Sequence, residues 1–125
     1  MDIKAVFYVK SGGKAPVEEY LKGLKNKNDL AKVVALIDKL LEEEGKLPAP
    51  HAKKVVDKIW ELRSHFGGRV FYFSQIGQKI VLLDGITKKT DKIAIHDLRR
   101  VKGYYQDYQI TLKERGYDSK LYHKN

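Results

Sequence analysis

The sequence predicts a single α+β domain, in which helices pack on one side of a mainly antiparallel sheet. The chain has 125 residues, a length that suits one domain with one core. Segments with helical spacing of apolar residues occur early and late in the chain, and three strand-like segments are clustered between them. Strands that are clustered after helices, rather than alternating with them, are typical of α+β domains.

The first part of the chain predicts one strand and two helices. Residues 3–9 are rich in β-branched and aromatic side chains, and Ser11-Gly12-Gly13 ends this strand. A first helix begins near Pro16, because proline is accepted in the first turn. Asn28 or Asp29 can cap a second helix, which a glycine at position 45 ends. The second helix carries one apolar stripe, consisting of Leu30, Val33, Val34, Ile37, Leu40 and Leu41.

The middle of the chain predicts three strands. Residues 58–63 alternate between two faces, and residues 69–74 form the next strand. Gly67-Gly68 between them marks a tight hairpin. Residues 79–86 contain an unbroken apolar run, which is typical of a central strand buried on both faces.

A long helix over residues 95–115 completes the predicted order β-α-α-β-β-β-α. Its apolar face consists of Leu98, Val101, Tyr105, Tyr108 and Leu112. Gly116 is the expected C-cap. We therefore expect one domain over residues 1–116 and a loose tail over residues 117–125.

The net charge of +9 is unevenly distributed along the chain. Residues 1–50 contain nine Lys and Arg against eight Asp and Glu, a net charge of +1, whereas residues 51–125 contain sixteen against eight, a net charge of +8. An asymmetric basic surface is typical of proteins that bind a polyanion, above all nucleic acid. A solvated basic surface that binds nothing is the other interpretation of the charge alone.

Composition argues against several other classes of protein. The chain has no cysteine, which excludes disulfides and thiolate chemistry and fits a reducing cytoplasm. No secretory signal and no membrane-spanning run are apparent, so we expect a cytoplasmic protein with no membrane partner. The four histidines lack the paired spacing of metal ligands, so no metal site is expected.

Three short segments stand in order in the middle of the chain: Glu61-Leu62-Arg63, Gly68-Arg69-Val70-Phe71-Tyr72, and the run Ile80 to Leu83 leading to Lys88-Lys89-Thr90. Together with the element order and their spacings, these segments resemble the RelE/HigB superfamily and within it the phage-derived Gp49-like branch. The resemblance covers roughly residues 3–110. Two positions differ from the usual pattern of the branch, since Ile86 stands in place of an aromatic residue and Ile93 in place of a proline.

This resemblance implies the toxin of a type II toxin–antitoxin system. Such a toxin is a metal-independent endoribonuclease that enters the A site of the small ribosomal subunit and cuts the mRNA there. It requires no cofactor, because a 2′-hydroxyl can attack the adjacent phosphate directly. The resemblance also implies a cognate helix-turn-helix antitoxin, through which the toxin would contact operator DNA only indirectly.

Arg63 and Arg69 are the first candidates for catalysis. A hairpin that turns near Phe66-Gly67 would place them opposite each other on one face of the sheet. Like charges directly opposite destabilise a sheet, so a phosphate between the two arginine forks would explain the pair. The alternatives are two arginines that extend into water, or Arg63 paired with Glu61. The matching position in the resembled family favours Arg69 for stabilising the transition state.

Other candidates surround this pair in the sequence. Lys88 and Lys89 follow the central strand, where the resembled family places a basic residue in the cleft, and Lys53 and Lys54 precede the first hairpin strand. As bare dipeptides, both lysine pairs could equally be solvated. Two roles are open for Glu61, which could act as a base or hold Arg63. His96 could transfer protons near neutral pH or lie unused on the surface, and the same holds for His65 in the hairpin turn.

The last helix carries candidates for contacts with the ribosome. Arg99, Arg100 and Lys102 are placed for phosphate contacts, which would position the protein without reading sequence. Tyr104 lies one position away from the apolar stripe and could stack on a base if it is exposed. A helix face in contact only with water is the alternative for this cluster.

Two other functions fit the sequence less well. One is a non-catalytic nucleic-acid-binding protein of the same fold, acting with a DNA-binding antitoxin. The other is a small basic interaction domain outside this family, which would leave the opposed arginines unexplained. Replacing Arg69 would discriminate between these functions, since only an enzyme would lose RNA cleavage.

Overall fold

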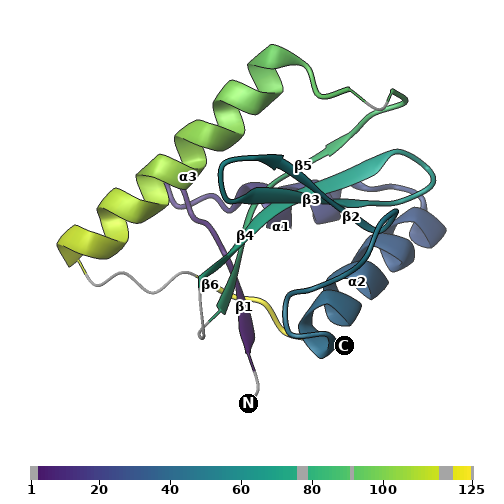
Figure 1. Ribbon diagram of the computed structural model, residues 1–125, viewed down its shortest axis with the longest axis horizontal. Helices are drawn as coiled ribbons and strands as arrows, with labels where there is room; N and C mark the ends of the chain where they lie inside the picture. The colour runs from purple at the N-terminus through teal and green to yellow at the C-terminus, as the bar shows by residue number, and fades with distance from the viewer. Residues whose placement is uncertain (1–2, 76–78, 91, 116–119, 125) are drawn as a thin grey trace.

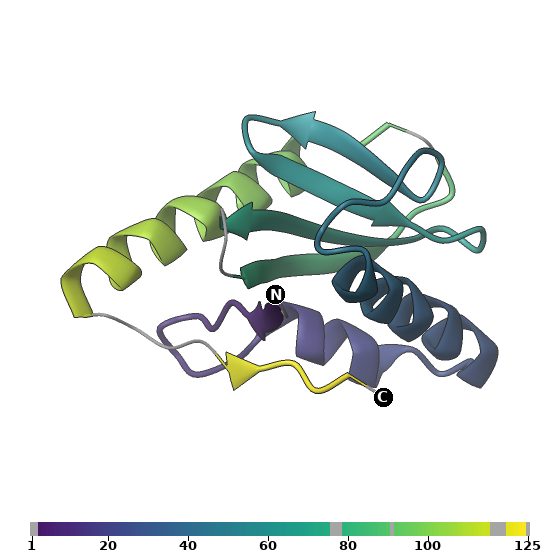
Figure 2. The same cartoon turned by 60° about the horizontal axis from the view of Figure 1, so that its bottom comes forward.

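The chain folds into three layers, with a sheet between two groups of helices (Figures 1 and 2). The structure is a computed structural model that describes residues 3–75, 79–90, 92–115 and 120–124. The helices α1 (Pro16–Gly23) and α2 (Lys27–Glu42) cover one face of the sheet, and α3 (Ile95–Arg115) covers the other. The α+β class is therefore confirmed, but the expectation that all helices pack on one side is wrong, because the sheet is apolar on both faces.

The described residues form a six-stranded sheet with the order β2-β3-β4-β5-β1-β6. Its strands are β1 (Lys4–Phe7), β2 (Ala52–Val56), β3 (Ile59–Arg63), β4 (Gly68–Gln75), β5 (Lys79–Thr87) and β6 (Lys120–Leu121). Only β1 and β5 pair in parallel, and every other pair is antiparallel. The sequence did not predict β2 or β6. β2 is a lysine-containing edge strand of only five residues, which resembles a loop in composition.

Both faces of β5 are buried, as the sequence predicts. Ile80 and Leu82 pack under α1 and α2, whereas Val81 and Leu83 pack under α3, and all four are fully buried. Gly85 further along β5 allows α1 to approach closely, because a Cβ atom there would lie 2.4 Å from the ring of Tyr20. β5 thus contributes side chains to both apolar cores, one on each face of the sheet.

The helices follow their predicted boundaries with one difference. Asn26, two residues before the expected cap, begins α2 by accepting hydrogen bonds from the backbone N–H groups of Asn28 and Asp29 at 2.8 and 3.2 Å. In α3, Val101 and Tyr108 are fully buried against the sheet, as its apolar stripe predicts. The side chain of Leu112 and the whole of Gly116 lie outside the described part of the structure. The expected place of Leu112 on the apolar face and the expected cap at Gly116 therefore stay predictions.

The C-terminal residues 120–124 do not form the loose tail that we expected. Residues 120 and 121 form β6 along the outer edge of β1. The ring of Tyr122 is buried edge-on against Phe7, and its hydroxyl donates to Asp38 of α2 at 2.8 Å. This segment therefore covers a sheet edge that would otherwise be open to pairing with other chains.

Candidate anion-binding site

The hairpin between β3 and β4 brings Arg63 and Arg69 together as predicted. The two residues are direct partners in the antiparallel register, and Glu61 pairs with Phe71 two residues further along. Paired residues project to the same face. Because Phe71 belongs to the core under α3, the arginines and Glu61 lie on the α3 side of the sheet.

Arg69 is almost completely buried, and its guanidinium holds the hairpin turn. Its Nη1 donates to the carbonyl oxygens of Ser64 and Gly68 at 3.2 and 3.1 Å. The turn is tight, because Gly67 has a φ of +105° and a Cβ atom there would lie 2.0 Å from the backbone oxygen of Lys88. The Nε of Arg69 is buried without a hydrogen-bond partner. Arg69 therefore contributes a buried positive charge to the site. Its hydrogen bonds also stabilise the turn that follows Arg63.

Arg63 is the more accessible of the two arginines. Its side chain is 21% exposed, and its Nε lies 3.6 Å from Oε1 of Glu61. Glu61 itself is only 2% exposed, and its Oε2 is buried without a hydrogen-bond partner. This geometry fits a carboxylate that orients Arg63 better than a base in contact with substrate.

Burial raises the pKa of Glu61, and four nearby cations oppose this shift: Arg69, Arg63, Lys53 and Lys88. Desolvation disfavours the charged carboxylate, whereas neighbouring positive charge favours it. The direction of the shift means that burial outweighs the cations. The cluster therefore joins one carboxylate, which is poorly solvated, to four positive charges, an excess that an external anion would balance. We call these five residues the cationic cluster.

The register also separates the members of the two lysine pairs. Lys53 pairs with Glu61 and so projects to the face of the cationic cluster, whereas Lys54 pairs with Trp60 and projects to the opposite face. The amino group of Lys88 donates to the backbone oxygen of Lys92, and Lys88 N–H donates to Gly67 O at 2.7 Å. Lys89 is exposed.

A second charged cluster lies on the same face, between β5 and α3. Arg100 donates from Nε to Asp84 at 2.9 Å and from Nη2 to Asp97 at 2.7 Å. Asp84 is buried, and it also accepts from the N–H of Gly85 at 2.9 Å. Burial raises the pKa of Asp84, although Arg100 and the Gly85 N–H act against this shift. Arg100 is therefore committed to two carboxylates, and we call this group the closed cluster.

The other candidates on α3 occupy different environments. His96 is 79% exposed and lies 3.4 Å from Asp97 through its Nε2. Arg99 is exposed and Lys102 is partly exposed. Tyr104 is half-buried rather than exposed, because its ring packs against Tyr8 with 5.0 Å between the centroids.

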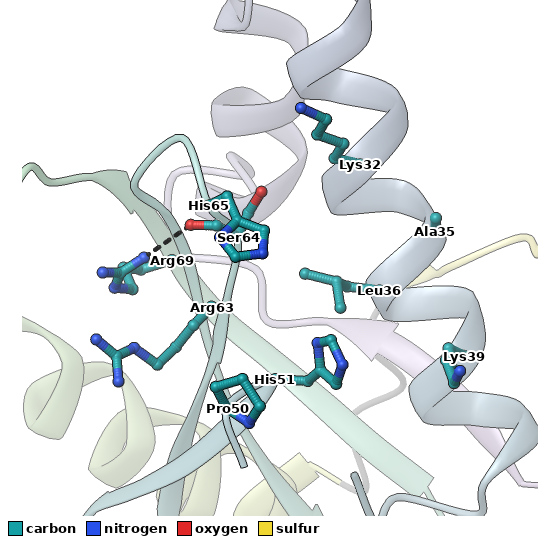
Figure 3. Close-up of a pocket in the computed structure, with 10 residues that line it drawn as sticks. All are labelled: Lys32, Ala35, Leu36, Lys39, Pro50, His51, Arg63, Ser64, His65 and Arg69. Atoms are coloured by element: carbon teal, nitrogen blue, oxygen red, sulfur yellow. Dashed lines mark hydrogen bonds between the residues drawn. The ribbon is translucent and has the colours of Figure 1, made fainter. Parts of the chain in front are cut away.

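Beside the hairpin turn, a pocket of about 620 Å³ opens between the hairpin and α2 (Figure 3). The guanidinium groups of Arg63 and Arg69 extend away from α2, toward the α3 side of the sheet, and α2 contributes side chains to the opposite wall of the pocket. His51 and His65 lie between the arginines and α2. The complete lining comprises Lys32, Ala35, Leu36, Lys39, Pro50, His51, Arg63, Ser64, His65 and Arg69.

Sequence reasoning missed the pairing role of Asp84 and the place of His51. Asp84 ends an apolar run, and a polar residue that follows a buried strand is a signal for a site or a buried pair. His51 is distant from the hairpin in sequence, and its backbone lies beside that of Arg63 only because β2 pairs with β3. Predicting β2 would have brought this histidine into consideration.

Over the described ranges, no group of three or more His, Asp and Glu side chains is placed to hold a metal ion. Over the same ranges, none of the helices has the length and apolar character needed to cross a bilayer.

The fold and site define a small α+β protein with a cationic cluster at a β-hairpin. Residues 19–106 match the family described as Phage derived protein Gp49-like (DUF891), and the chain belongs to this family. The Gp49-like family is associated with the toxins of toxin–antitoxin systems. No curated protein matches the chain significantly.

Proposed function

We propose that this protein is the toxin of a type II toxin–antitoxin system and cuts mRNA in the ribosomal A site. The observation that carries the proposal is the cationic cluster, in which two arginines opposite each other share one buried carboxylate with two lysines. Arginine forks match phosphate oxygens, so this cluster suits a phosphodiester that gains charge during reaction. Membership of the Gp49-like family and the RelE/HigB resemblance support the same conclusion.

The reaction is attack by a ribose 2′-oxygen on the adjacent phosphorus. The new P–O2′ bond forms as the P–O5′ bond breaks, which leaves a 2′,3′-cyclic phosphate and a 5′-hydroxyl. One proton leaves the 2′-hydroxyl for a base, and one proton is supplied to the departing O5′. Cations that are already in place when charge develops stabilise the transition state without reorganisation.

Arg63 is the residue that we assign to the non-bridging phosphate oxygens, because it is the accessible arginine. Glu61 is a positioning residue, since its carboxylate lies against Arg63 but is buried. Arg69 holds the turn and contributes charge, while Lys53 projects to the same face. His96 is the candidate for proton transfer, because it is the exposed imidazole at the start of α3.

Contacts with the ribosome and partner complete the proposal. Arg99, Lys102 and Lys89 are solvent-accessible basic residues that could contact ribosomal RNA phosphates without reading sequence. A cognate helix-turn-helix antitoxin would neutralise the toxin and connect it to operator DNA. With these two partners, the protein would act in the cytoplasm.

Primer extension on a defined mRNA in a cell-free translation reaction tests this function. Wild-type protein should give discrete cuts only when ribosomes are present, and the upstream fragments should end in a 2′,3′-cyclic phosphate. Arg63→Ala should abolish the cuts, whereas Lys25→Ala, which removes one positive charge from the exposed loop between α1 and α2, should retain them. An absence of cuts from folded wild-type protein would favour the non-catalytic nucleic-acid-binding protein instead.

A further inference from the structure

The two faces of the sheet differ in what they offer to a partner. The guanidinium groups of Arg63 and Arg69 extend to the α3 face, whereas the pocket of about 620 Å³ lies on the other face, between α2 and the hairpin (Figure 3). This volume lies within the roughly 300–1,000 Å³ typical of binding pockets. The pocket is therefore separate from the surface on which Arg63 would hold a phosphate, and the chemistry of its own walls decides which ligand fits it.

The pocket is a groove alongside α2. Lys32 and Lys39 lie roughly two helical turns apart on the α2 wall, and Ala35 and Leu36 lie between them. The opposite wall consists of Pro50, His51, Ser64, His65 and the chain at the two arginines. The middle of the α2 wall is thus apolar, and a positive charge stands at each end of it.

The charges along α2 favour a protein over a nucleic acid. No carboxylate lines the groove, and within the described ranges neither Lys32 nor Lys39 is paired with a carboxylate. One turn beyond Lys39, however, the exposed Glu43 follows at the end of α2. A nucleic acid is negative along its whole length, so this carboxylate would repel it. A protein segment can instead place carboxylates at the two lysines and a different residue at Glu43.

The backbone of the hairpin wall favours a helix over an extended peptide. The N–H of His51 donates to Pro48 O at 3.0 Å, and the N–H of Arg63 donates to His51 O at 2.8 Å. The N–H of Ser64 donates to Gly68 O at 2.9 Å. An extended peptide binds mainly by adding main-chain hydrogen bonds to an open strand, and these N–H groups are already used. A helix satisfies its own backbone and needs only side-chain contacts with the groove.

We propose that this groove is a docking site for an amphipathic, acidic helix of a partner protein. The helix lies alongside α2, and its apolar residues pack on Ala35, Leu36 and Pro50. Two carboxylates of the helix, seven positions apart, meet Lys32 and Lys39. Because the partner leaves the α3 face uncovered, it does not compete with a phosphate at the cationic cluster. The inference goes beyond the proposed function and does not depend on it.

A synthetic helix tests the docking site on the full-length protein. The probe peptide carries two leucines between two glutamates that are seven positions apart, and a scrambled peptide of the same composition is its control. Fluorescence anisotropy should show saturable binding of the probe, about tenfold tighter than that of the scrambled peptide, which cannot present these side chains on one face. By NMR, the probe should shift the ring signals of His51 and His65. Those of His123, which lines a different pocket, should stay unchanged.

Reversal of the two lysine charges gives the sharpest comparison. The double variant Lys32→Glu/Lys39→Glu should bind the probe about tenfold more weakly than wild type does. A probe with lysines in place of its glutamates should bind this variant better than it binds wild type. Lys25→Glu/Lys46→Glu makes the same change in net charge at exposed positions outside the groove, and it should alter the affinity less than about twofold. Arg63→Ala should bind the probe as wild type does, because this side chain extends to the α3 face.

Several results would overturn the docking site. They are equal binding of the probe and the scrambled peptide, equal affinities of the two charge-reversed variants, or no shift at His51 and His65. If single-stranded RNA of mixed sequence displaced the probe as effectively as unlabelled probe does, the groove would bind polyanions in general, and the acidic helix would be wrong. Primer extension judges the proposed enzyme separately. Cuts without probe binding would remove the docking site and leave the enzyme, whereas probe binding without cuts would do the reverse.

Discussion

The cationic cluster on β3 and β4 and the closed cluster between β5 and α3 differ in how their charges are matched. In the closed cluster, Arg100 meets two carboxylates at 2.9 and 2.7 Å. In the cationic cluster, Glu61 faces two arginines and two lysines, and its contact with Arg63 is 3.6 Å long. Buried Glu61 Oε2 and Arg69 Nε also lack hydrogen-bond partners there.

The difference separates a structural ion pair from a site suited to a ligand. A buried polar atom without a partner is unfavourable, so native structures satisfy nearly all of them. In the closed cluster, Arg100 of α3 binds Asp84 of β5 and Asp97 of α3, so it holds α3 against the sheet and needs no external ligand. The cationic cluster reaches the same balance only when an anion binds. Both carboxylates have a raised pKa because of burial, so the pKa direction alone does not distinguish the two clusters.

The largest expected effect is on activity, at Arg63. Arg63→Ala should lower the rate of ribosome-dependent cleavage by about 10²–10³-fold, the range for removing one preorganised contact to a charged transition state. Its stability should fall by only about 1 kcal/mol, because the ion pair that it loses is long and partly exposed. Cleavage rates from primer extension and urea unfolding curves on the same preparation measure both quantities. If Arg63→Ala were strongly destabilised but still cut mRNA at the wild-type rate, the roles of the two clusters would be reversed.

The next effect is on stability, at Arg100. Arg100→Ala leaves Asp84 buried without its cation, and the free energy of unfolding should fall by about 2–3 kcal/mol. The adjacent Arg99→Ala removes the same side chain from an exposed position, so its effect should stay within about 0.5 kcal/mol. Urea unfolding at neutral pH measures both variants. Equal stabilities for Arg99→Ala and Arg100→Ala would show that the closed cluster contributes nothing to the fold.

The third effect is stabilisation by a small anion. Inorganic phosphate at ten times its dissociation constant should raise the free energy of unfolding by about 1.4 kcal/mol, since it binds the folded state only. The melting temperature of wild type should therefore rise with phosphate concentration, and sodium chloride at equal ionic strength is the control. Arg63→Ala should lose most of the rise, and Arg100→Ala should retain it. Retention of the rise in Arg63→Ala would place the anion elsewhere.

The local sequence was enough to predict those elements in which the pattern of apolar residues or the turn residues are distinctive. The stripe of α2, the apolar run of β5 and the hairpin that opposes Arg63 to Arg69 follow from the sequence alone. β2 and β6 did not, because short polar strands exist only through their partners β3 and β1. The placement of α3 opposite α1 and α2 likewise depends on both faces of the sheet being apolar.

The candidate site was predictable as a list of residues but not as an assignment of roles. Sequence reasoning favoured Arg69 over Arg63 for catalysis, and the structure shows Arg69 bound to the turn carbonyls. Arg100 was grouped with its exposed neighbours, but its two aspartate partners lie 3 and 16 positions away. Burial and pairing of this kind arise from tertiary contacts, which residue type and spacing along the chain do not report.

The smallest expected effect concerns the pH dependence of stability at Glu61. Because burial raises the pKa of Glu61 above its usual value of 4.5, the folded state holds the proton more tightly than the unfolded state. The resulting stabilisation is fully present below pH 4.5 and is lost as the pH rises through the folded pKa. Glu61→Gln keeps the shape of the side chain but has no proton to lose. Relative to wild type, it should therefore become more stable as the pH rises through this window, and the difference should level off above it.

Urea unfolding of wild type and Glu61→Gln at matched pH values from 4 to 8 measures this difference. Asp84→Asn is the companion variant, since its carboxylate has the same direction of shift but leaves Arg100 with Asp97. If Glu61→Gln instead lost stability relative to wild type on raising the pH, the four cations would outweigh burial. The carboxylate would then be matched by its neighbours, and the cationic cluster would no longer differ from the closed one in needing an anion.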